Sequence, residues 1–163
     1  MRTGGKAHKR SLAPLIVILA FMLASAEGIA NDGSGLVVSA RGEVSVTSNG
    51  ESRPLAPGNF IYEHDEISVS NRSFAVLQFV DGAKVTLRPD SLLIIEQYSA
   101  EAATLNLVSG SFRVVAGSIA RYQSENYRIR TPVALMGMSG NESSVTLCGD
   151  KICDQQGLVE ILE

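Results

Sequence analysis

The chain has 163 residues, with 14 Lys and Arg against 17 Asp and Glu, and a formal net charge of −3. Its basic residues are scattered through the sequence after residue 10. Binding to phosphate groups depends on a high density of Lys and Arg, so nucleic acid and anionic lipid are excluded as main partners. The length fits one domain.

The first 26 residues have the features of a signal peptide. An apolar run, Leu15–Leu23, follows a start that is basic through Arg2, Lys6, Lys9 and Arg10. Small residues precede the predicted cleavage position between Ala26 and Glu27. The apolar run is shorter than the roughly 20 residues of a membrane span, although an uncleaved anchor remains the alternative. The sequence therefore predicts a periplasmic or secreted protein without stable membrane insertion after cleavage.

Cleavage would change both the length and the charge of the chain. The mature protein would hold 10 Lys and Arg against 17 Asp and Glu, a net charge of −7. Its first residues, 27–35, are rich in Gly, Asn, Asp and Ser and are predicted to form a flexible arm. Residues 36–163 form the predicted domain.

From Val37 onward the chain alternates apolar and polar residues with the period of two that predicts β-strands. The alternation through Val44 and Val46 ends at Asn49-Gly50, a hairpin signal. The run Phe74–Val80 is nearly all apolar, which predicts a strand covered on both faces. A turn at Asp81-Gly82 follows, and then Ala83–Arg88 alternates again, with Ala83, Val85 and Leu87 directed inward.

Further strand-like runs extend to the end of the chain, and helical signals are scarce. The runs are Leu92–Ile95, Leu105 with Leu107, Phe112 with Val114, Tyr127 with Ile129, and Leu158–Leu162. One helical turn is considered at Ser99–Ala103, and a polar loop is predicted at Gly117–Asn126. About ten short strands predict an all-β fold of two facing sheets, as a sandwich, a roll or a solenoid-like stack. A strict repeat length is absent.

Two cysteines remain in the mature chain, Cys148 and Cys153, with four residues between them. In an oxidising compartment this spacing favours a local disulfide. A zinc site would need four ligands, and His64 is the only further imidazole in the mature chain. The thioredoxin-type redox motif has two residues between its cysteines. We therefore expect a disulfide and no metal or other cofactor.

Candidate catalytic groups are few. The segment Glu63-His64-Asp65-Glu66 could ligate a divalent metal or supply a general base, but adjacent residues of an extended chain point to opposite sides. A solvated turn is the favoured interpretation. Gly137-Met138-Ser139-Gly140 does not match the Gly-x-Ser-x-Gly nucleophile motif. We therefore expect no enzymatic activity and no catalytic residues.

One pair of basic residues shares a strand face. Arg128 and Arg130 alternate with apolar residues, and they could bind an acidic partner. A solvated face is the default interpretation of such a pair.

The ordered landmarks of the chain resemble the FecR domain, a periplasmic sensing and signalling module. The resemblance covers roughly 36–147 and depends on these segments in order: Arg41-Gly42-Glu43-Val44, Leu55 with Gly58, Asp65-Glu66-Ile67, Phe79-Val80-Asp81-Gly82, Pro89-Asp90-Ser91, Leu107-Val108-Ser109-Gly110-Ser111-Phe112, and Thr131-Pro132-Val133-Ala134. Gly137-Met138-Ser139-Gly140-Asn141 departs from the Gly-Val-Arg-Gly-Thr usual in the family, and Val69 stands where a Thr is common. Only a signal peptide precedes the domain here, so the resemblance does not imply direct anti-sigma activity.

The resemblance implies a non-catalytic exported domain that contacts an unidentified envelope protein in sensing, signalling or assembly. The strand-like run Leu158–Leu162 would offer an open edge to a partner strand. The alternative is a small-ligand or polysaccharide-binding module at the cell surface.

Overall fold

The computed structural model describes Met1, Gly4 and residues 33–161. The predicted signal peptide and its cleavage position at Ala26 and Glu27 lie outside these residues. Residues 33–161 form fifteen strands in two sheets, one short helix and one 3-10 turn, so the all-β prediction is confirmed. Fifteen strands replace the predicted ten or so, partly because β3 (Glu51–Pro54) and β14 (Lys151–Gln156) are mostly exposed and lack the alternation of apolar and polar residues that marks a strand in the sequence. Among the described residues, none forms a helix of the length and hydropathy needed to cross a membrane.

Sheet A has seven strands in the order β14-β13-β10-β7-β6-β1-β4. All of its pairs are antiparallel. Its strands are β1 (Gly35–Arg41), β4 (Phe60–Ile61), β6 (Phe74–Phe79), β7 (Lys84–Leu87), β10 (Ser111–Val115), β13 (Glu142–Cys148) and β14 (Lys151–Gln156).

Sheet B has eight strands in the order β15-β12-β11-β9-β8-β5-β2-β3. Only β9 and β11 pair in parallel. The chain leaves sheet B between them and returns through β10, α1 (Ser118–Tyr122) and η1 (Ser124–Asn126). The strands of sheet B are β2 (Val44–Ser48), β3 (Glu51–Pro54), β5 (Glu66–Val69), β8 (Ser91–Tyr98), β9 (Ala103–Ser109), β11 (Tyr127–Arg130), β12 (Leu135–Met138) and β15 (Leu158–Glu160).

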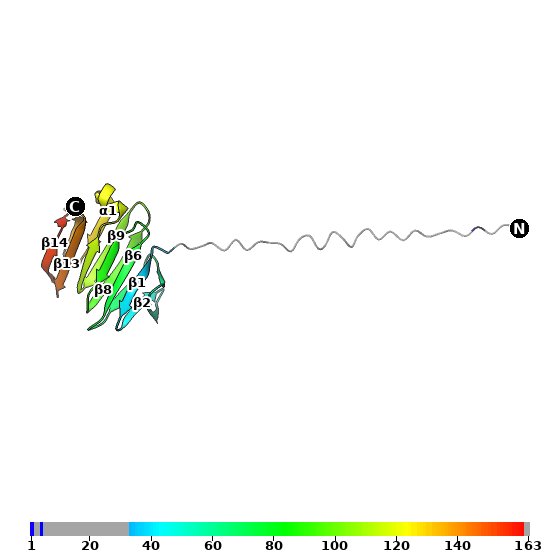
Figure 1. The fold of residues 1–163 in the computed structure, drawn as a ribbon, viewed down its shortest axis with the longest axis horizontal. Coiled ribbons are helices and arrows are strands. Elements are labelled where there is room, and N and C mark those ends of the chain that lie inside the picture. Colours follow the sequence, from blue (N-terminus) through cyan, green and yellow to red (C-terminus); the bar gives the residue numbers. More distant parts are fainter. Residues whose placement is uncertain (2–3, 5–32, 162–163) are drawn as a thin grey trace. The chain divides into compact units, whose positions relative to one another are not determined.

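Apart from the outermost strands β4 and β3, strand numbers rise along both sheets from one edge to the other, so the domain is built as a stack from its first strands to its last (Figure 1). β3 and β4 are the edge strands at the end where the described chain begins. β14 and β15 are the edge strands at the opposite end. The arrangement is the solenoid-like one of the predicted architectures.

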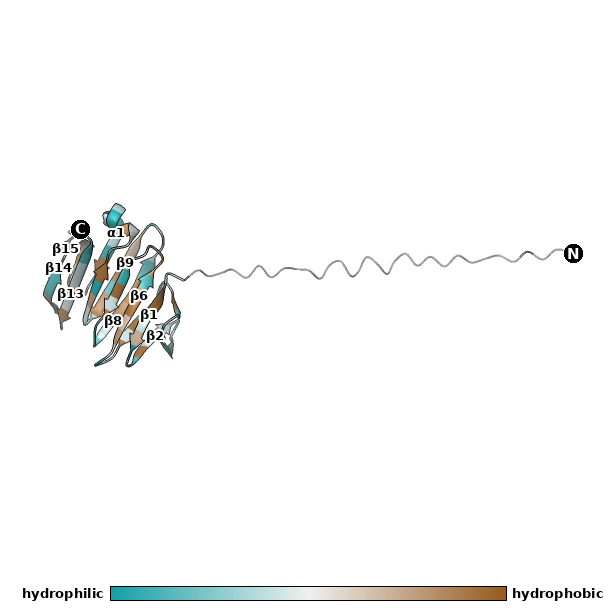
Figure 2. Cartoon of the chain, in the orientation of Figure 1, coloured by the Kyte–Doolittle hydropathy of each residue, from teal (hydrophilic) through white to brown (hydrophobic). Residues whose placement is uncertain are grey.

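The core is formed by alternate residues of most strands, and Figure 2 shows the hydrophobic residues in brown along the strands. Ala83, Val85 and Leu87 are completely buried, as predicted. In β6 only one face is fully covered, because Phe74 and Val76 on the other face are half-buried and Val80 is exposed. The prediction that both faces of this strand are covered is therefore wrong, since no strand or helix of residues 33–161 forms a third layer outside sheet A.

The two predicted Gly turns differ in conformation. Asn49 and Gly50 both have positive φ, at 51° and 84°, as a type I′ hairpin requires. At Asp81-Gly82 only Gly82 has positive φ, at 85°. Asp81 instead turns the chain with its side chain, whose Oδ1 accepts a hydrogen bond from the Ala83 N–H at 3.0 Å. The turn is confirmed, and its conformation differs from the type I′ turn at Asn49-Gly50.

The helix occurs at a different place from the one considered. Ser99–Ala103 is a tight turn, in which the Ala102 N–H donates to Ser99 Oγ at 3.2 Å and the Ser99 N–H donates to the Ala102 carbonyl at 2.9 Å. α1 lies within Gly117–Asn126, which was predicted to be a polar loop. This helix has five residues, too few to show a helical period in the sequence.

Ser109-Gly110 is a corner between the sheets, since β9 belongs to sheet B and β10 to sheet A. Ser91 Oγ donates to the Ser111 carbonyl at 3.0 Å and accepts from the Ser111 N–H at 2.9 Å. Gly110 has a φ of 82°, and a Cβ atom on it would lie 2.5 Å from Ser91 Cα. Only glycine fits this corner.

Candidate functional site

The two edge strands at the start of the stack are poor surfaces for pairing with another chain. β3 carries Glu51, Arg53 and Pro54, all exposed. Charged residues and proline on an edge strand discourage pairing. β4 has only two residues, Phe60 and Ile61.

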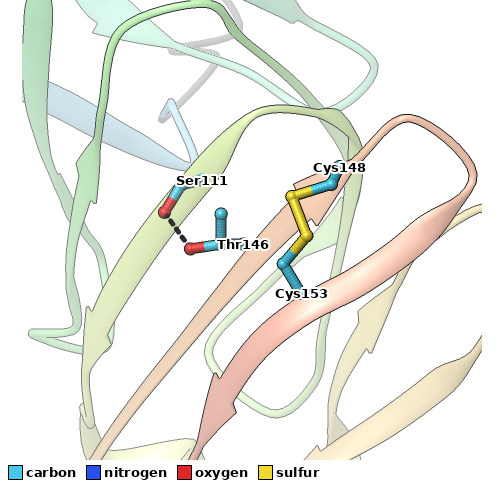
Figure 3. The surroundings of a disulfide bond; sticks show 4 residues. All are labelled: Ser111, Thr146, Cys148 and Cys153. Atoms are coloured by element: carbon cyan, nitrogen blue, oxygen red, sulfur yellow. Dashed lines mark hydrogen bonds between the residues drawn. A yellow bond between two sulfur atoms is a disulfide. The ribbon is translucent and has the colours of Figure 1, made fainter.

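At the other end of the stack, β14 is also protected. It carries the charges of Lys151 and Asp154, and its pairing with β13 is interrupted by a shift of register after Thr146. A disulfide joins Cys153 on β14 to Cys148 at the end of β13, with their Cα atoms 5.8 Å apart (Figure 3). Nearby, Ser111 and Thr146 link β10 to β13 through their hydroxyls at 2.9 Å. A charged, irregular and cross-linked strand is a poor template for a partner strand.

β15 is an edge strand of sheet B that carries an exposed apolar side chain. Leu158 is half-buried, Val159 is 58% exposed, and Glu160 carries the single charge of the strand. On its inner side β15 pairs with β12, where the Ser139 N–H donates to the Gly157 carbonyl at 2.8 Å and the Ile161 N–H donates to the Leu135 carbonyl at 2.7 Å. Main-chain groups of an antiparallel strand alternate in direction. Those of Leu158 and Glu160 therefore point away from β12, toward the open edge.

Gly157 positions β15 by turning the chain from sheet A into sheet B. Its φ is 63°, and a Cβ atom on it would lie 2.1 Å from the Glu142 carbonyl oxygen. Its own carbonyl accepts a hydrogen bond from Ser143 Oγ at 2.5 Å as well as the one from Ser139. β15 is thus fixed against both β12 and β13 by one residue.

Two adjoining hollows, which we call the β15 groove, lie beside this edge. Their volumes are about 430 Å³ and 370 Å³, and both are lined by Ser124, Met138 and Val159. The first is also lined by Arg121, and the second by Arg128 and Gly137. The groove therefore joins an apolar edge to two arginines, one from α1 and one from β11.

The two arginines predicted to share a strand face do so, since Arg128 and Arg130 are both exposed on the outer face of β11. Their surroundings differ. Arg130 Nε lies 3.1 Å from Glu96 Oε2, and Glu96 also accepts a hydrogen bond from Asn106 at 2.8 Å. Arg128 has no ion pair among residues 33–161. Only one of the pair is therefore available to another molecule.

A polar cluster of the half-buried Asp81 and two buried tyrosines, Tyr98 and Tyr127, supports the helix that borders the groove. Asp81 Oδ2 accepts a hydrogen bond from the Ile119 N–H of α1 at 3.3 Å, and its carbonyl accepts from the Ser118 N–H at 2.9 Å. Asp81 Oδ1 accepts from the Tyr98 hydroxyl at 2.9 Å. The Tyr98 ring stacks on Phe79 with centroids 3.9 Å apart and meets Tyr127 edge-on at 6.2 Å.

The two tyrosines of this cluster are held in their neutral form. Burial raises the pKa of Tyr98 first, and the neighbouring Tyr127 and Asp81 raise that pKa further. Burial also raises the pKa of Tyr127. A phenolate here would be desolvated beside a carboxylate, so the cluster is suited to support α1 and unsuited to proton transfer near neutral pH.

The acidic segment forms a turn, with His64 at a φ of 69°. Asp65 is completely buried, and its Oδ2 accepts from the Tyr62 N–H at 2.9 Å. Glu63 Oε1 accepts from the Tyr98 N–H at 2.7 Å. The turn interpretation is confirmed, but the expectation that it is solvated is wrong for Asp65, which holds the turn from inside. Within residues 33–161 no group of three or more His, Cys, Asp or Glu is placed to hold a metal ion.

Ser139 and His64 do not form a catalytic pair. Ser139 follows β12, whereas His64 precedes β5, and β11, β9 and β8 separate these strands in sheet B.

Sequence reasoning missed the anchoring role of Asp81 and the corner at Gly157. The sequence did contain a sign of the Gly157 corner, since this single glycine stands directly between the segments of β14 and β15 without a longer loop.

Comparison with known proteins identifies a family for the chain. No curated protein matches the sequence. A family model described as FecR protein matches residues 65–163, which include every strand from β5 to β15. The match starts after β4 and continues beyond the predicted limit at residue 147. Because it covers more than half of the 163 residues, the chain belongs to the FecR family, whose domains are signalling-related and associated with the bacterial envelope.

Proposed function

We propose that this protein is an exported, non-catalytic FecR-family domain that acts by contact with another envelope protein through the β15 edge. The observation that carries the proposal is that, among the residues the structure describes, β15 is an edge strand of sheet B whose Leu158 and Glu160 main-chain groups point outward beside exposed Val159. The other three edges are short, charged, irregular or contain proline.

The mechanism is addition of a partner strand to sheet B. In this mode of recognition main-chain hydrogen bonds supply affinity, and side-chain pockets supply specificity. β15 has three residues, so its main-chain groups alone would bind weakly. The adjoining β15 groove offers the side-chain contacts that a specific complex needs.

Export agrees with the chemistry of the chain. The basic and apolar start predicts removal of residues 1–26, with cleavage between Ala26 and Glu27. The disulfide between exposed Cys148 and Cys153 is of the kind that persists in oxidising compartments. The domain would then meet its partner outside the cytoplasm, in sensing, signalling or assembly.

A second candidate function has one observation in its favour. A shallow hollow of about 580 Å³ lies at the β2–β3 hairpin and is lined by polar groups, among them Glu43, Ser45 and Arg53. This volume is within the range of small-ligand sites. Binding of a small molecule or polysaccharide there would be the alternative role.

The test is capture of partners from envelope extracts by the tagged mature protein and two variants at one position. Glu160→Pro removes the outward N–H of β15 and leaves the pairing with β12 intact, since proline is tolerated where an edge N–H faces solvent. Glu160→Ala removes the charge and keeps the N–H. Thermal unfolding must show both variants folded.

The proposal predicts that one envelope protein is retained by wild type and by Glu160→Ala but is lost with Glu160→Pro. Equal retention by both variants would contradict edge pairing. Retention of glycan or peptidoglycan by all three proteins, with loss on Arg53→Ala, would favour the alternative.

A further inference from the structure

We propose that the partner segment carries a glutamate whose carboxylate enters the β15 groove between Arg121 and Arg128. This inference rests on the proposed function and adds the chemistry of the partner. It identifies the partner as an extended acidic and apolar peptide segment.

The shape of the groove comes from one row of residues across three strands. Arg128 on β11 is paired with Gly137 on β12, and Gly137 is paired with Val159 on β15. Gly137 has no side chain, so the surface is open from the edge strand toward Arg128. Ile161 forms one wall, because its Cδ1 would lie 3.5 Å from a Cβ atom on Gly137.

The charges of the groove favour an anion. Among the described residues, Arg113 and Arg130 are paired with Glu142 and Glu96. Arg121 and Arg128 have no ion pair there, and both are exposed. The two free guanidinium groups line the groove of a chain that is otherwise net acidic. Guanidinium groups bind carboxylates through charge-assisted hydrogen bonds.

One carboxylate limits what the groove accepts. Glu125 of η1 lines the same hollow as Arg128. With two arginines and one glutamate, the groove has room for a single additional negative charge. A segment with one acidic side chain among apolar residues fits better than a run of acidic residues, since like charges at close range repel.

The spacing of strands indicates glutamate rather than aspartate. Neighbouring strands of a sheet lie about 4.8 Å apart. A partner strand would lie one spacing outside β15, and β11 lies two spacings inside it, so three spacings separate the partner strand from β11. The partner residue opposite Val159 points to the same outer face as Val159 and Arg128. A longer side chain is needed to approach Arg128 across the gap at Gly137.

The experiment uses the folded mature protein and three synthetic peptides, with binding followed by NMR shifts of backbone amides. Each peptide alternates threonine and valine, and its central residue is glutamate, aspartate or lysine. We expect the glutamate peptide to shift the amides of Arg128, Gly137 and Val159 and to bind about fivefold more tightly than the lysine peptide, the range for partly exposed ion pairs.

Matched variants distinguish binding in the β15 groove from binding elsewhere on the outer face of the sheet. Arg128→Gln should lower affinity for the glutamate peptide about fivefold, and Arg130→Gln, which removes the paired neighbour, should leave it unchanged. Gly137→Val should abolish binding by filling the groove, and its Cβ meets no atom closer than 3.5 Å. Equal binding of the glutamate and lysine peptides, or equal losses in Arg128→Gln and Arg130→Gln, would overturn the inference.

The two proposals fail in different ways. If both charged peptides bind equally and Glu160→Pro abolishes both, edge pairing holds and the glutamate inference is wrong. If the glutamate peptide binds Glu160→Pro as it binds wild type, strand addition is wrong, and a carboxylate site at Arg128 remains.

Discussion

The Tyr98 hydroxyl donates a 2.9 Å hydrogen bond to Asp81 Oδ1, and the other oxygen of that carboxylate accepts from the first turn of α1. Tyr98 ends β8 of sheet B, whereas Asp81 follows β6 of sheet A. One carboxylate therefore joins both sheets to the helix that borders the β15 groove. The Asp81-Gly82 turn is a structural support for the candidate site.

Tyr98→Phe should lower the free energy of unfolding by about 2 kcal/mol, since it removes a hydrogen bond to a charged group in a mostly buried place. The ring stacking on Phe79 would remain. Urea denaturation measures the change. Tyr122→Phe is the control, because Tyr122 is 82% exposed and should unfold as wild type does. An unchanged stability of Tyr98→Phe would show that Asp81 does not depend on this bond.

Alkaline pH should destabilise the domain through the same cluster. Burial raises the pKa of Tyr98 and Tyr127 above the ordinary value of about 10. Because the folded pKa values exceed the unfolded ones, the stabilisation is complete below pH about 10 and declines as the pH rises above it. Denaturation midpoints across this range should fall less steeply in Tyr98→Phe. An identical slope in both proteins would exclude Tyr98 as the titrating group.

Gly157→Ala should displace β15, because its Cβ would collide with the Glu142 carbonyl oxygen and its φ is positive. Gly149→Ala is the matched control, with a φ of 64° and no atom near its Cβ position. We expect the free energy of unfolding of Gly149→Ala to fall by about 1 kcal/mol from backbone strain alone. The free energy of unfolding of Gly157→Ala should fall further than that of Gly149→Ala, and hydrogen exchange in β15 should be faster. Equal losses would mean that the contact with Glu142 relaxes at no cost.

Replacing both Cys148 and Cys153 by serine should cost about 2 kcal/mol, the chain-entropy value for so small a loop. The protection of β14 against hydrogen exchange should fall most, while the core strands β8 and β9 should lose only the protection that this global change accounts for. Thermal unfolding with and without a reductant gives an independent measure. Equal losses of protection in β14 and in the core strands would show that the disulfide has no additional local effect on β14.

The local pattern of the sequence predicted the strands well where alternation was clean. Ala83, Val85 and Leu87 are buried because a period of two places them on one face. The burial of Phe74–Val80 was predicted wrongly, because the sequence alone does not distinguish an apolar residue on an exposed outer face from a buried one. Asp81 was assigned to a turn, but its bond to α1 joins residues 38 positions apart, which local patterns do not encode.

The candidate site was predicted only in part. The run after Gly157 was recognised as a strand with an open edge, and Arg128 with Arg130 as a shared face. Arg130 is ion-paired and Arg128 is not, because Arg130 contacts Glu96, which is 34 residues away in the sequence. The row from Arg128 to Val159 depends on the order of β11, β12 and β15 in the sheet. Such order follows from the packing of the whole domain.

Site-specific photo-cross-linking at position 159 tests the central claim most directly. A benzophenone amino acid would replace Val159 in cells that make the protein, and Thr86 on the outer face of β7 would serve as the control position. We predict an adduct between position 159 and an extended segment of a different envelope protein, absent from position 86 and lost when Glu160→Pro is added. Adducts that form equally at both positions, persist with Glu160→Pro, or join only two copies of this chain would contradict the account.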